Sequence, residues 1–447
     1  MRWLRNALLA MPVIAGCATD APRQTTEAVP ELRAVSHEEP APAPAIHAFP
    51  LAFERPTLAA DELIRFVLER NPTLEQMTAA AAAADARYPQ VVSPDDPMVA
   101  FQTAPGSIGS QNANYAARVE LSQKLNLFGK RDLKGQGALA EARAARQDID
   151  DAKLQLIEAA KDALADYALA VQSLGVAEEN LKLLREFRGS AETRYKNGLA
   201  PQQDILQADV EAAKLEEKIV SLKRSRQVAK ARINTLAHLP ADGPLPPPAE
   251  LPAPAPLANP QELRAQAVAN RPDLKAIFDR LAADEAALAG ASREYKPDIE
   301  LTTAYDGFWQ GESGRPLQFQ VGARMNLPTR LGKRDAAVLE ARAKIAQRRA
   351  EAAKLTDQIG YQIQEAYEQA RESDEVVWLY QEKALPAAEA NVKEAQTAYV
   401  NGKVPFLSLV EAQRNLIAVR DRLNEVRAGV FRRRAALDRV LGGAAVP

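Results

Sequence analysis

The chain has 447 residues and a formal net charge of −2, so its charge balance gives no electrostatic case for binding nucleic acid. Charged residues make up 26% and aromatic residues only 5%, a composition typical of long helices rather than of a thick globular core. A single cysteine excludes an intrachain disulfide and a cysteine-cluster metal site.

The first 17 residues resemble a bacterial lipoprotein signal. Arg2 and Arg5 precede a short apolar stretch that ends in Ile-Ala-Gly before Cys17. This pattern predicts that Cys17 is lipidated and serves as a membrane anchor. Ala18 follows it instead of Asp, which fits delivery to the outer membrane. The alternative is an ordinary cleaved signal with an incidental cysteine.

Residues 18–56 are rich in Pro, Ala, Glu and Thr and show no apolar period, so they predict a flexible tether. A helix is predicted from 61 to 84, and Asn71-Pro72 predicts a break inside it. No window has 18 uninterrupted apolar residues, so the sequence predicts no transmembrane helix.

A much longer helix is predicted from 132 to 195, a stretch without proline. At 1.5 Å per residue it would extend about 95 Å. Asn197-Gly198 predicts its end, and Pro201 begins a second helix to 238, which gives an antiparallel hairpin. Apolar residues at alternating steps of three and four predict coiled-coil packing: Ile157, Ala160, Leu164, Tyr167, Val171, Leu174 and Leu181.

The second half repeats the first. The residues Gly-Lys-Arg-Asp at 129–132 return at 332–335, an offset of 203, and Tyr-x-Asn-Gly at 195–198 returns at an offset of 204. We interpret this as a tandem duplication with units at 57–239 and 261–443, joined by a proline-rich connector at 240–260. The second long helices are predicted at 333–400 and 405–441, and Pro386 is expected to remove a hydrogen bond and bend the first of them.

Each unit also holds two strand candidates, at 97–103, 113–124, 298–306 and 316–326, in which apolar and polar residues alternate. One interpretation is a sheet half-buried on a soluble core. The other is a set of membrane-barrel strands, since their length suits a tilted membrane strand. Tyr305, Phe308 and Trp309 would then form an interfacial belt. Four strands cannot close a barrel, so several copies would be needed.

With this duplicated helix–strand–strand–hairpin unit, residues 58–442 resemble the TolC-type outer-membrane efflux proteins. The resemblance implies a mainly helical trimer. Its 12 long helices would form a periplasmic α-helical barrel joined to a 12-stranded outer-membrane β-barrel. It also implies two partners, a periplasmic adaptor and an inner-membrane pump of the resistance-nodulation-division class. The Gly-Lys-Arg motif and Tyr-x-x-Gly resemble the heavy-metal or cation branch.

The resemblance also implies site residues. The adaptor is expected to contact the hairpin tips, although plain turn chemistry explains the same residues: Tyr195, Gly198, Pro201, Tyr399, Gly402 and Pro405. The candidate gate comprises Glu411, with Ser408 where a second acid is common and Asp204 at the equivalent place in the first unit. A solvated helix face is the alternative for these three.

Neither a catalytic motif nor a metal or cofactor motif is found in the sequence, which therefore predicts no enzyme. The predicted function is a passive outer-membrane exit duct for metal cations or drugs, lipid-anchored, with its tunnel in the periplasm. Organic solvents are a further possible cargo. The alternative is a lipid-anchored periplasmic coiled-coil adaptor or scaffold.

Overall fold

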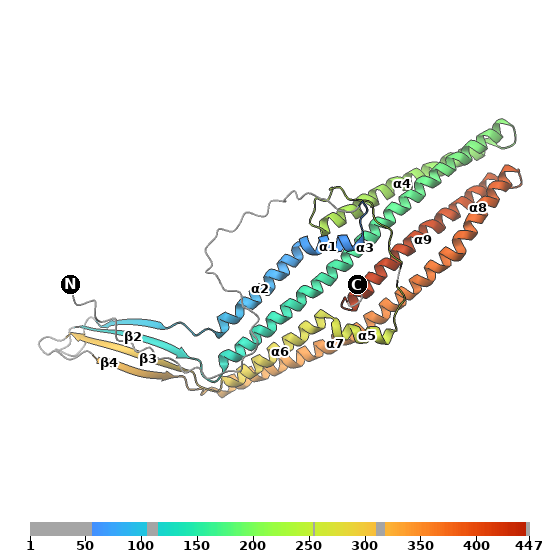
Figure 1. The fold of residues 1–447 in the computed structure, drawn as a ribbon. Helices are drawn as coiled ribbons and strands as arrows, with labels where there is room; N and C mark the ends of the chain where they lie inside the picture. Colours follow the sequence, from blue (N-terminus) through green and yellow to red (C-terminus); the bar gives the residue numbers. More distant parts are fainter. Residues whose placement is uncertain (1–55, 105–114, 254, 310–317, 444–447) are drawn as a thin grey trace. The chain divides into compact units, whose positions relative to one another are not determined.

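The computed structural model describes residues 56–104, 115–253, 255–309 and 318–443 (Figure 1). All of them belong to one compact unit. The predicted signal, the lipidation site Cys17 and the tether up to residue 55 lie outside the described residues.

The same order of elements occurs twice along the chain (Figure 1). The first half comprises α1 (Ala60–Arg70), α2 (Pro72–Val92), β1 (Met98–Ala104), β2 (Tyr115–Leu125), α3 (Lys130–Lys196) and α4 (Gln202–Leu236). The second comprises α5 (Pro260–Asn270), α6 (Pro272–Arg293), β3 (Ile299–Trp309), β4 (Gln318–Met325), α7 (Leu331–Leu379), the π-helix η1 (Tyr380–Ala384), α8 (Leu385–Val400) and α9 (Phe406–Val440).

The predicted break at Asn71-Pro72 is confirmed. The Asn71 side chain accepts a hydrogen bond from the backbone N–H of Thr73 at 2.9 Å, which caps α2. The predicted end at residue 84 is wrong, because α2 continues to Val92 through Pro89. Packing explains the extra turns, since α3 passes so close at Gly135 that a Cβ there would lie 2.6 Å from Val92.

The long helix α3 has 67 residues, which makes it about 100 Å long. Its predicted apolar seam is confirmed in the main. Ala160, Leu164, Tyr167, Leu174 and Leu181 are all at most 9% exposed, and the other two seam residues are partly exposed. The seam is covered because α3 packs against α2, α4, α6 and α9.

The second rod is continuous but contains a π turn, η1, directly before α8. The repeat offset grows from 203 at the start of this rod to 204 at its end, so the stretch from Lys333 to Tyr399 is one residue longer than its equivalent from Lys130 to Tyr195. A π turn has one extra residue per turn and accommodates that insertion. Pro386 lies in the first turn of α8, where the N–H that it lacks would have bonded the Glu382 carbonyl inside η1.

The four strands form one antiparallel sheet in the order β1-β2-β3-β4, so the predicted strands are confirmed. The register places Phe101 opposite Val119, Val119 opposite Tyr305 and Tyr305 opposite Phe319. These four side chains are 43–68% exposed and form an apolar row across one face. The side chains of Phe308 and Trp309 are outside the described set. Within the described residues, no helix is apolar over a length sufficient to span a bilayer.

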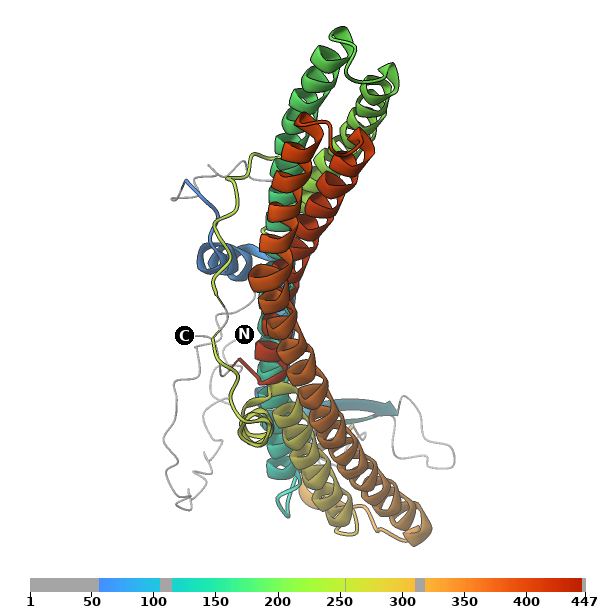
Figure 2. The ribbon, with the colours of Figure 1, turned by 90° about the vertical axis from the view of Figure 1, so that its right-hand side faces the viewer.

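The connector between the halves has a turn at 241–243, and its described residues form no helix before Pro260. Its Pro247 carbonyl accepts from the Leu58 N–H at 2.8 Å, and the Ala249 N–H donates to the Leu58 carbonyl at 2.9 Å. Leu58 is fully buried there, in a core that α1 shares with α3 and α4. A second core joins α5, α7 and α9. A third cluster joins the ends of the two long hairpins, which Figure 2 shows beside one another.

Candidate functional site

The two hairpin tips share one backbone conformation. In the first tip the Gly198 N–H donates to the Tyr195 carbonyl at 2.9 Å, and the Leu199 N–H donates to the Arg194 carbonyl at 2.8 Å. This is the Schellman arrangement that ends a helix with a left-handed residue. Gly198 has φ +72° and Gly402 has φ +71°, and the second tip repeats both hydrogen bonds 204 residues later. The sequence-predicted turns are therefore in place.

Each tip proline precedes the following helix by one residue. Pro201 and Pro405 are the N-cap residues of α4 and α9, with extended backbones. Their carbonyls accept hydrogen bonds from the backbone N–H groups of Asp204 at 3.3 Å and Ser408 at 3.1 Å. Both proline side chains are exposed. The prolines thus set the direction of the returning helices and lie on the tip surface.

The two tip tyrosines occupy equivalent positions but have opposite environments. Tyr195 is 44% exposed, whereas Tyr399 is 3% exposed. The Tyr399 ring meets Phe406 edge-on, with centroids 5.3 Å apart, and its hydroxyl donates to the Asp204 carboxylate at 3.1 Å. Burial, together with the negative charge of Asp204, raises the pKa of Tyr399 to about 12. The ring and hydroxyl of Tyr399 are therefore engaged within the protomer, where they join the second hairpin to the first.

Arg194 adds a second link between the tips. Its guanidinium lies 5.1 Å from the Tyr399 ring centroid, a cation–π contact. One terminal nitrogen donates to the Val400 carbonyl at 2.5 Å, and the other donates to the Leu199 carbonyl at 3.4 Å. Sequence reasoning missed Arg194. A basic residue in the last turn of a helix is a weak signal, because such residues commonly bond the last carbonyls of their own helix.

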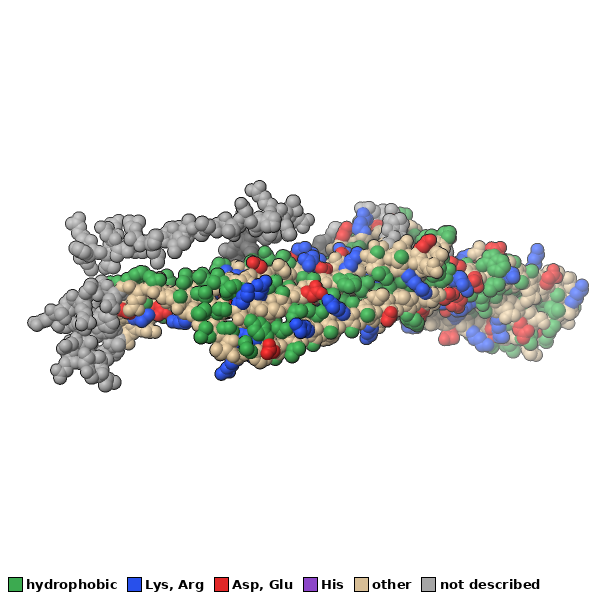
Figure 3. Space-filling model, turned by 90° about the horizontal axis from the view of Figure 1, so that it is seen from below, with side chains coloured by type: hydrophobic (Ala, Val, Ile, Leu, Met, Phe, Trp, Pro, Cys, Tyr) green, Lys and Arg blue, Asp and Glu red, His purple; other side chains and the backbone are tan. Residues whose placement is uncertain are grey.

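Below the tips, charged pairs connect α4 to α9. The Glu211 carboxylate accepts from Nε of Arg414 at 2.9 Å, and Lys218 binds Asp421. The hydrogen bond from Arg414 holds the pKa of Glu211 below its ordinary value. On the face that Figure 3 shows, charges of both signs are interspersed along the helices rather than gathered in one patch.

The structure gives the three gate candidates different surroundings. Asp204 is half-buried against Tyr399. Ser408 is half-buried in the first turn of α9, and Glu411 is exposed on the next turn. The charge of Glu411 acts on Arg414, whose pKa is raised chiefly by its hydrogen bond to Glu211. Asp204 is thus the candidate that connects the two hairpins.

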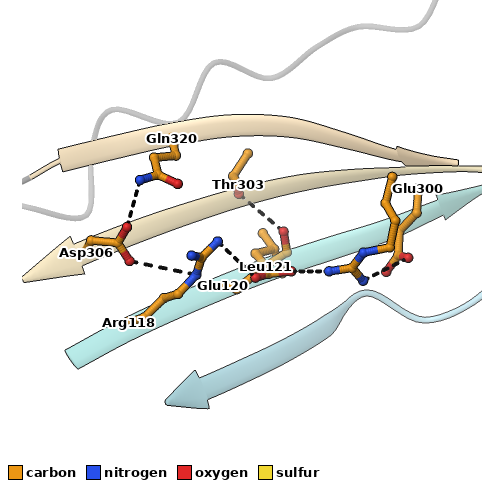
Figure 4. Close-up of polar contacts among 8 residues, drawn as sticks. Arg118, Glu120, Leu121, Glu300, Thr303, Asp306 and Gln320 are labelled. Carbon is orange, nitrogen blue, oxygen red and sulfur yellow. Dashed lines mark hydrogen bonds and ion pairs between the residues drawn. The ribbon is translucent and has the colours of Figure 1, made fainter. Parts of the chain in front are cut away.

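The sheet carries a second polar cluster on the face opposite the apolar row (Figure 4). Arg118 lies 3.3 Å from Glu120 and 3.8 Å from Asp306. Arg324 contacts Glu120 at 3.2 Å and reaches Glu300 at 3.3 Å. These contacts connect β2, β3 and β4. The charged groups on this face are therefore paired with groups of opposite charge, and the face is polar enough to lie against water. Among the described residues, no group of three or more His, Cys, Asp or Glu side chains could hold a metal ion.

Comparison with known proteins agrees with this architecture. Nodulation protein T of Rhizobium leguminosarum bv. viciae is 24% identical over 70% of this chain and 66% of its own length. The toluene efflux pump outer membrane protein TtgF of Pseudomonas putida is 26% identical over 58% of this chain and 53% of its own length. The matched regions thus span about two thirds or less of these relatives.

Solved structures show the same fold. The outer-membrane channel OprN superposes with a TM-score of 0.75 at 23% identity and covers 88% of this chain and 92% of its own. The family model described as outer membrane efflux protein matches residues 63–237 and 263–443, about four fifths of the sequence. The chain therefore belongs to the outer membrane efflux protein family.

Proposed function

We propose that this protein is a passive exit duct in the outer membrane, through which substrates leave a tripartite efflux system. The two faces of the sheet carry this proposal. One face exposes apolar side chains, including Val321 at 72% and Phe319 at 68%. The other holds paired charges (Figure 4). A strand with lipid on one side and water on the other requires this division.

The protein would act as a trimer. An open sheet edge leaves backbone N–H and C=O groups without partners, which costs several kcal/mol per group in hydrocarbon. Three copies would supply twelve strands for a closed barrel and twelve long helices for a periplasmic tunnel. The relatives and the fold support this assembly. Cys17 would add a lipid anchor at the outer membrane.

The periplasmic adaptor would bind the tips, and an inner-membrane pump of the resistance-nodulation-division class would supply energy and choose the cargo, metal cations or drugs among them. Tyr195, Gly198, Pro201, Gly402 and Pro405 are exposed there. Tyr399 is buried, so it would support the adaptor-binding surface indirectly, by holding the two tips together through its ring and hydroxyl.

The gate would lie just behind the tips. A tip opening that moves α8 and α9 away from α4 must break the bond between Tyr399 and Asp204. Glu411 and Ser408 would face the entrance from the first turns of α9. The protein itself would catalyse no reaction.

A matched pair of substitutions tests the duct. Val321→Arg places a charge on the face assigned to lipid, where it costs about 2–4 kcal/mol per copy at mid-membrane depth. Gln320→Arg places the same charge on the neighbouring residue of the polar face. We expect the first to abolish insertion and ion conductance in lipid bilayers and the second to keep both.

The rival proposal is a lipid-anchored periplasmic scaffold. It requires that the purified protein show neither conductance nor heat-modified gel mobility, and that both Arg variants behave alike. The exposed apolar row argues against it, because a soluble scaffold would leave this face in water.

A further inference from the structure

Two equivalent lysines lie in the first turns of the two longest helical rods, and among the described residues a side-chain partner is found for Lys130 alone. Lys130 is 6% exposed. Its ammonium donates to the Lys296 carbonyl at 3.0 Å and to the Asp298 carboxylate at 2.8 Å, and it lies 3.6 Å from Glu294. All three acceptors lie at the end of α6 or in the segment that leads to β3. Lys130 therefore joins the first repeat to the second.

Lys333 is the equivalent residue of the second repeat, 203 positions later in the same Gly-Lys-Arg-Asp motif. It is exposed, and within the described part of the chain no hydrogen bond or ion pair of its side chain is found. Among the described residues, no segment offers Lys333 the acceptors that Lys130 has. A second copy would offer the equivalent segment of the first repeat, which lies between α2 and β1.

The helices show the same missing neighbour. α6 lies between α3 and α7, whereas α2 packs against α3 alone among the long helices. In α2 only Ala81 is buried. In α6, by contrast, a full face is buried: Pro272, Leu274, Ala276, Ile277, Ala283 and Ala286. The side of α2 that corresponds to the α7-contacting side of α6 is therefore uncovered.

The sheet is open at the matching edges. β1 and β4 are its two outermost strands, and β4 leads into α7 as β2 leads into α3. The segment from α2 to β1 corresponds to the segment from α6 to β3, and it contains Asp95 and Asp96. The Asp95 carboxylate already accepts from the Asn126 amide at 3.2 Å. The exposed Asp96 carboxylate has no partner in the described residues.

We propose that Lys333 of one copy binds Asp96 of a second copy, where the start of α7 packs against the open side of α2. The contact reproduces between copies the bond that Lys130 makes between repeats. This inference rests on the closed multi-copy duct proposed above and names its interface. The Lys333 ammonium and the Asp96 carboxylate carry opposite charges. Burial at the interface would make two like charges at this place costly.

Charge exchange tests the contact. Lys333→Glu and Asp96→Lys should each lower the temperature at which the wild-type oligomer dissociates on a gel, and the double variant should restore it. Lys403→Glu makes the same charge change in the exposed tip turn and should leave the dissociation temperature unchanged. Circular dichroism checks that each variant folds. A Lys333→Glu oligomer as heat-stable as wild type, or a double variant without recovery, would overturn the proposal.

Cross-linking gives an independent readout. Oligomers assembled from equal amounts of ¹⁴N- and ¹⁵N-labelled chains are treated with a carbodiimide, which joins a lysine to a carboxylate at contact distance. We expect a Lys333–Asp96 peptide pair of mixed isotope composition. Pairs within one isotope only, or no such pair, would refute the contact while a conducting wild-type oligomer leaves the duct intact. A monomeric, non-conducting wild type would refute both.

Discussion

Tyr399→Phe removes one hydroxyl and leaves the ring, so it isolates the hydrogen bond between the two hairpin tips. A hydrogen bond to a charged group contributes about 1.5–3 kcal/mol. Asp204 is half-buried and can regain water when the tyrosine hydroxyl is gone, so we expect the lower end of this range. A loss of about 1.4 kcal/mol changes an equilibrium about tenfold. The open probability of the channel should rise by about that factor for each copy.

Planar-bilayer recordings would measure this change, and the equivalent residue of the first repeat provides the control. Tyr195→Phe removes a hydroxyl from a 44% exposed side chain and should leave the open probability unchanged. Equal effects of the two variants, or none from Tyr399→Phe, would refute the link. In combination with Asp204→Asn the effects should be less than additive, because both changes remove one bond.

Burial of Tyr399, together with the charge of Asp204 and the hydrogen bond to it, predicts that the tyrosine hydroxyl loses its proton only at high pH. The pKa of Tyr399 is raised to about 12 from an ordinary value of 10.0. The neutral Tyr399 hydroxyl should therefore contribute fully to the stability of the folded state below pH 10, and this contribution should be lost as the pH rises through about 12. A tyrosinate absorbance titration of wild type minus Tyr399→Phe should isolate one group that ionises near 12. A difference curve centred at the ordinary value would contradict the buried environment.

Three further predictions concern the tips and the junction between helices and strands. Gly198→Val and Gly402→Val force a β-branched residue into the left-handed region, at a cost of at least about 1–2 kcal/mol each, and should abolish export with assembly intact on native gels. Lys130→Met removes a buried ammonium and its hydrogen bond to the partly buried Asp298, and should lower the free energy of unfolding by about 1.5–3 kcal/mol, measured by denaturant titration. The pKa of Glu211 is lowered in the folded protein from its ordinary value of 4.5. The stability that this carboxylate contributes should therefore be complete above pH 4.5 and be lost as the pH falls through the lowered pKa of the folded state. Glu211→Gln should flatten this dependence of stability on pH.

Local sequence signals determined much of this protein. A proline-free run with a heptad seam predicted α3, and alternation with period two predicted all four strands and their two faces. Asn-Gly followed by proline predicted both hairpin turns. These features follow from residues adjacent in the chain, because helical period, strand period and left-handed glycine act over a few positions. The helix α2 shows the limit, since contact with Gly135 extends it beyond its predicted end.

Only the tertiary structure decided what the equivalent residues of the two repeats do. Tyr195 and Tyr399 share a motif, yet one is exposed and the other is buried against Asp204. Lys130 and Lys333 share another, yet one is buried and the other is exposed. Burial and ion pairing depend on which element packs alongside, and the partner lies 168 residues away for Lys130 and 195 residues away for Tyr399. A repeated motif determines the local backbone, whereas the surrounding elements determine the environment of each side chain.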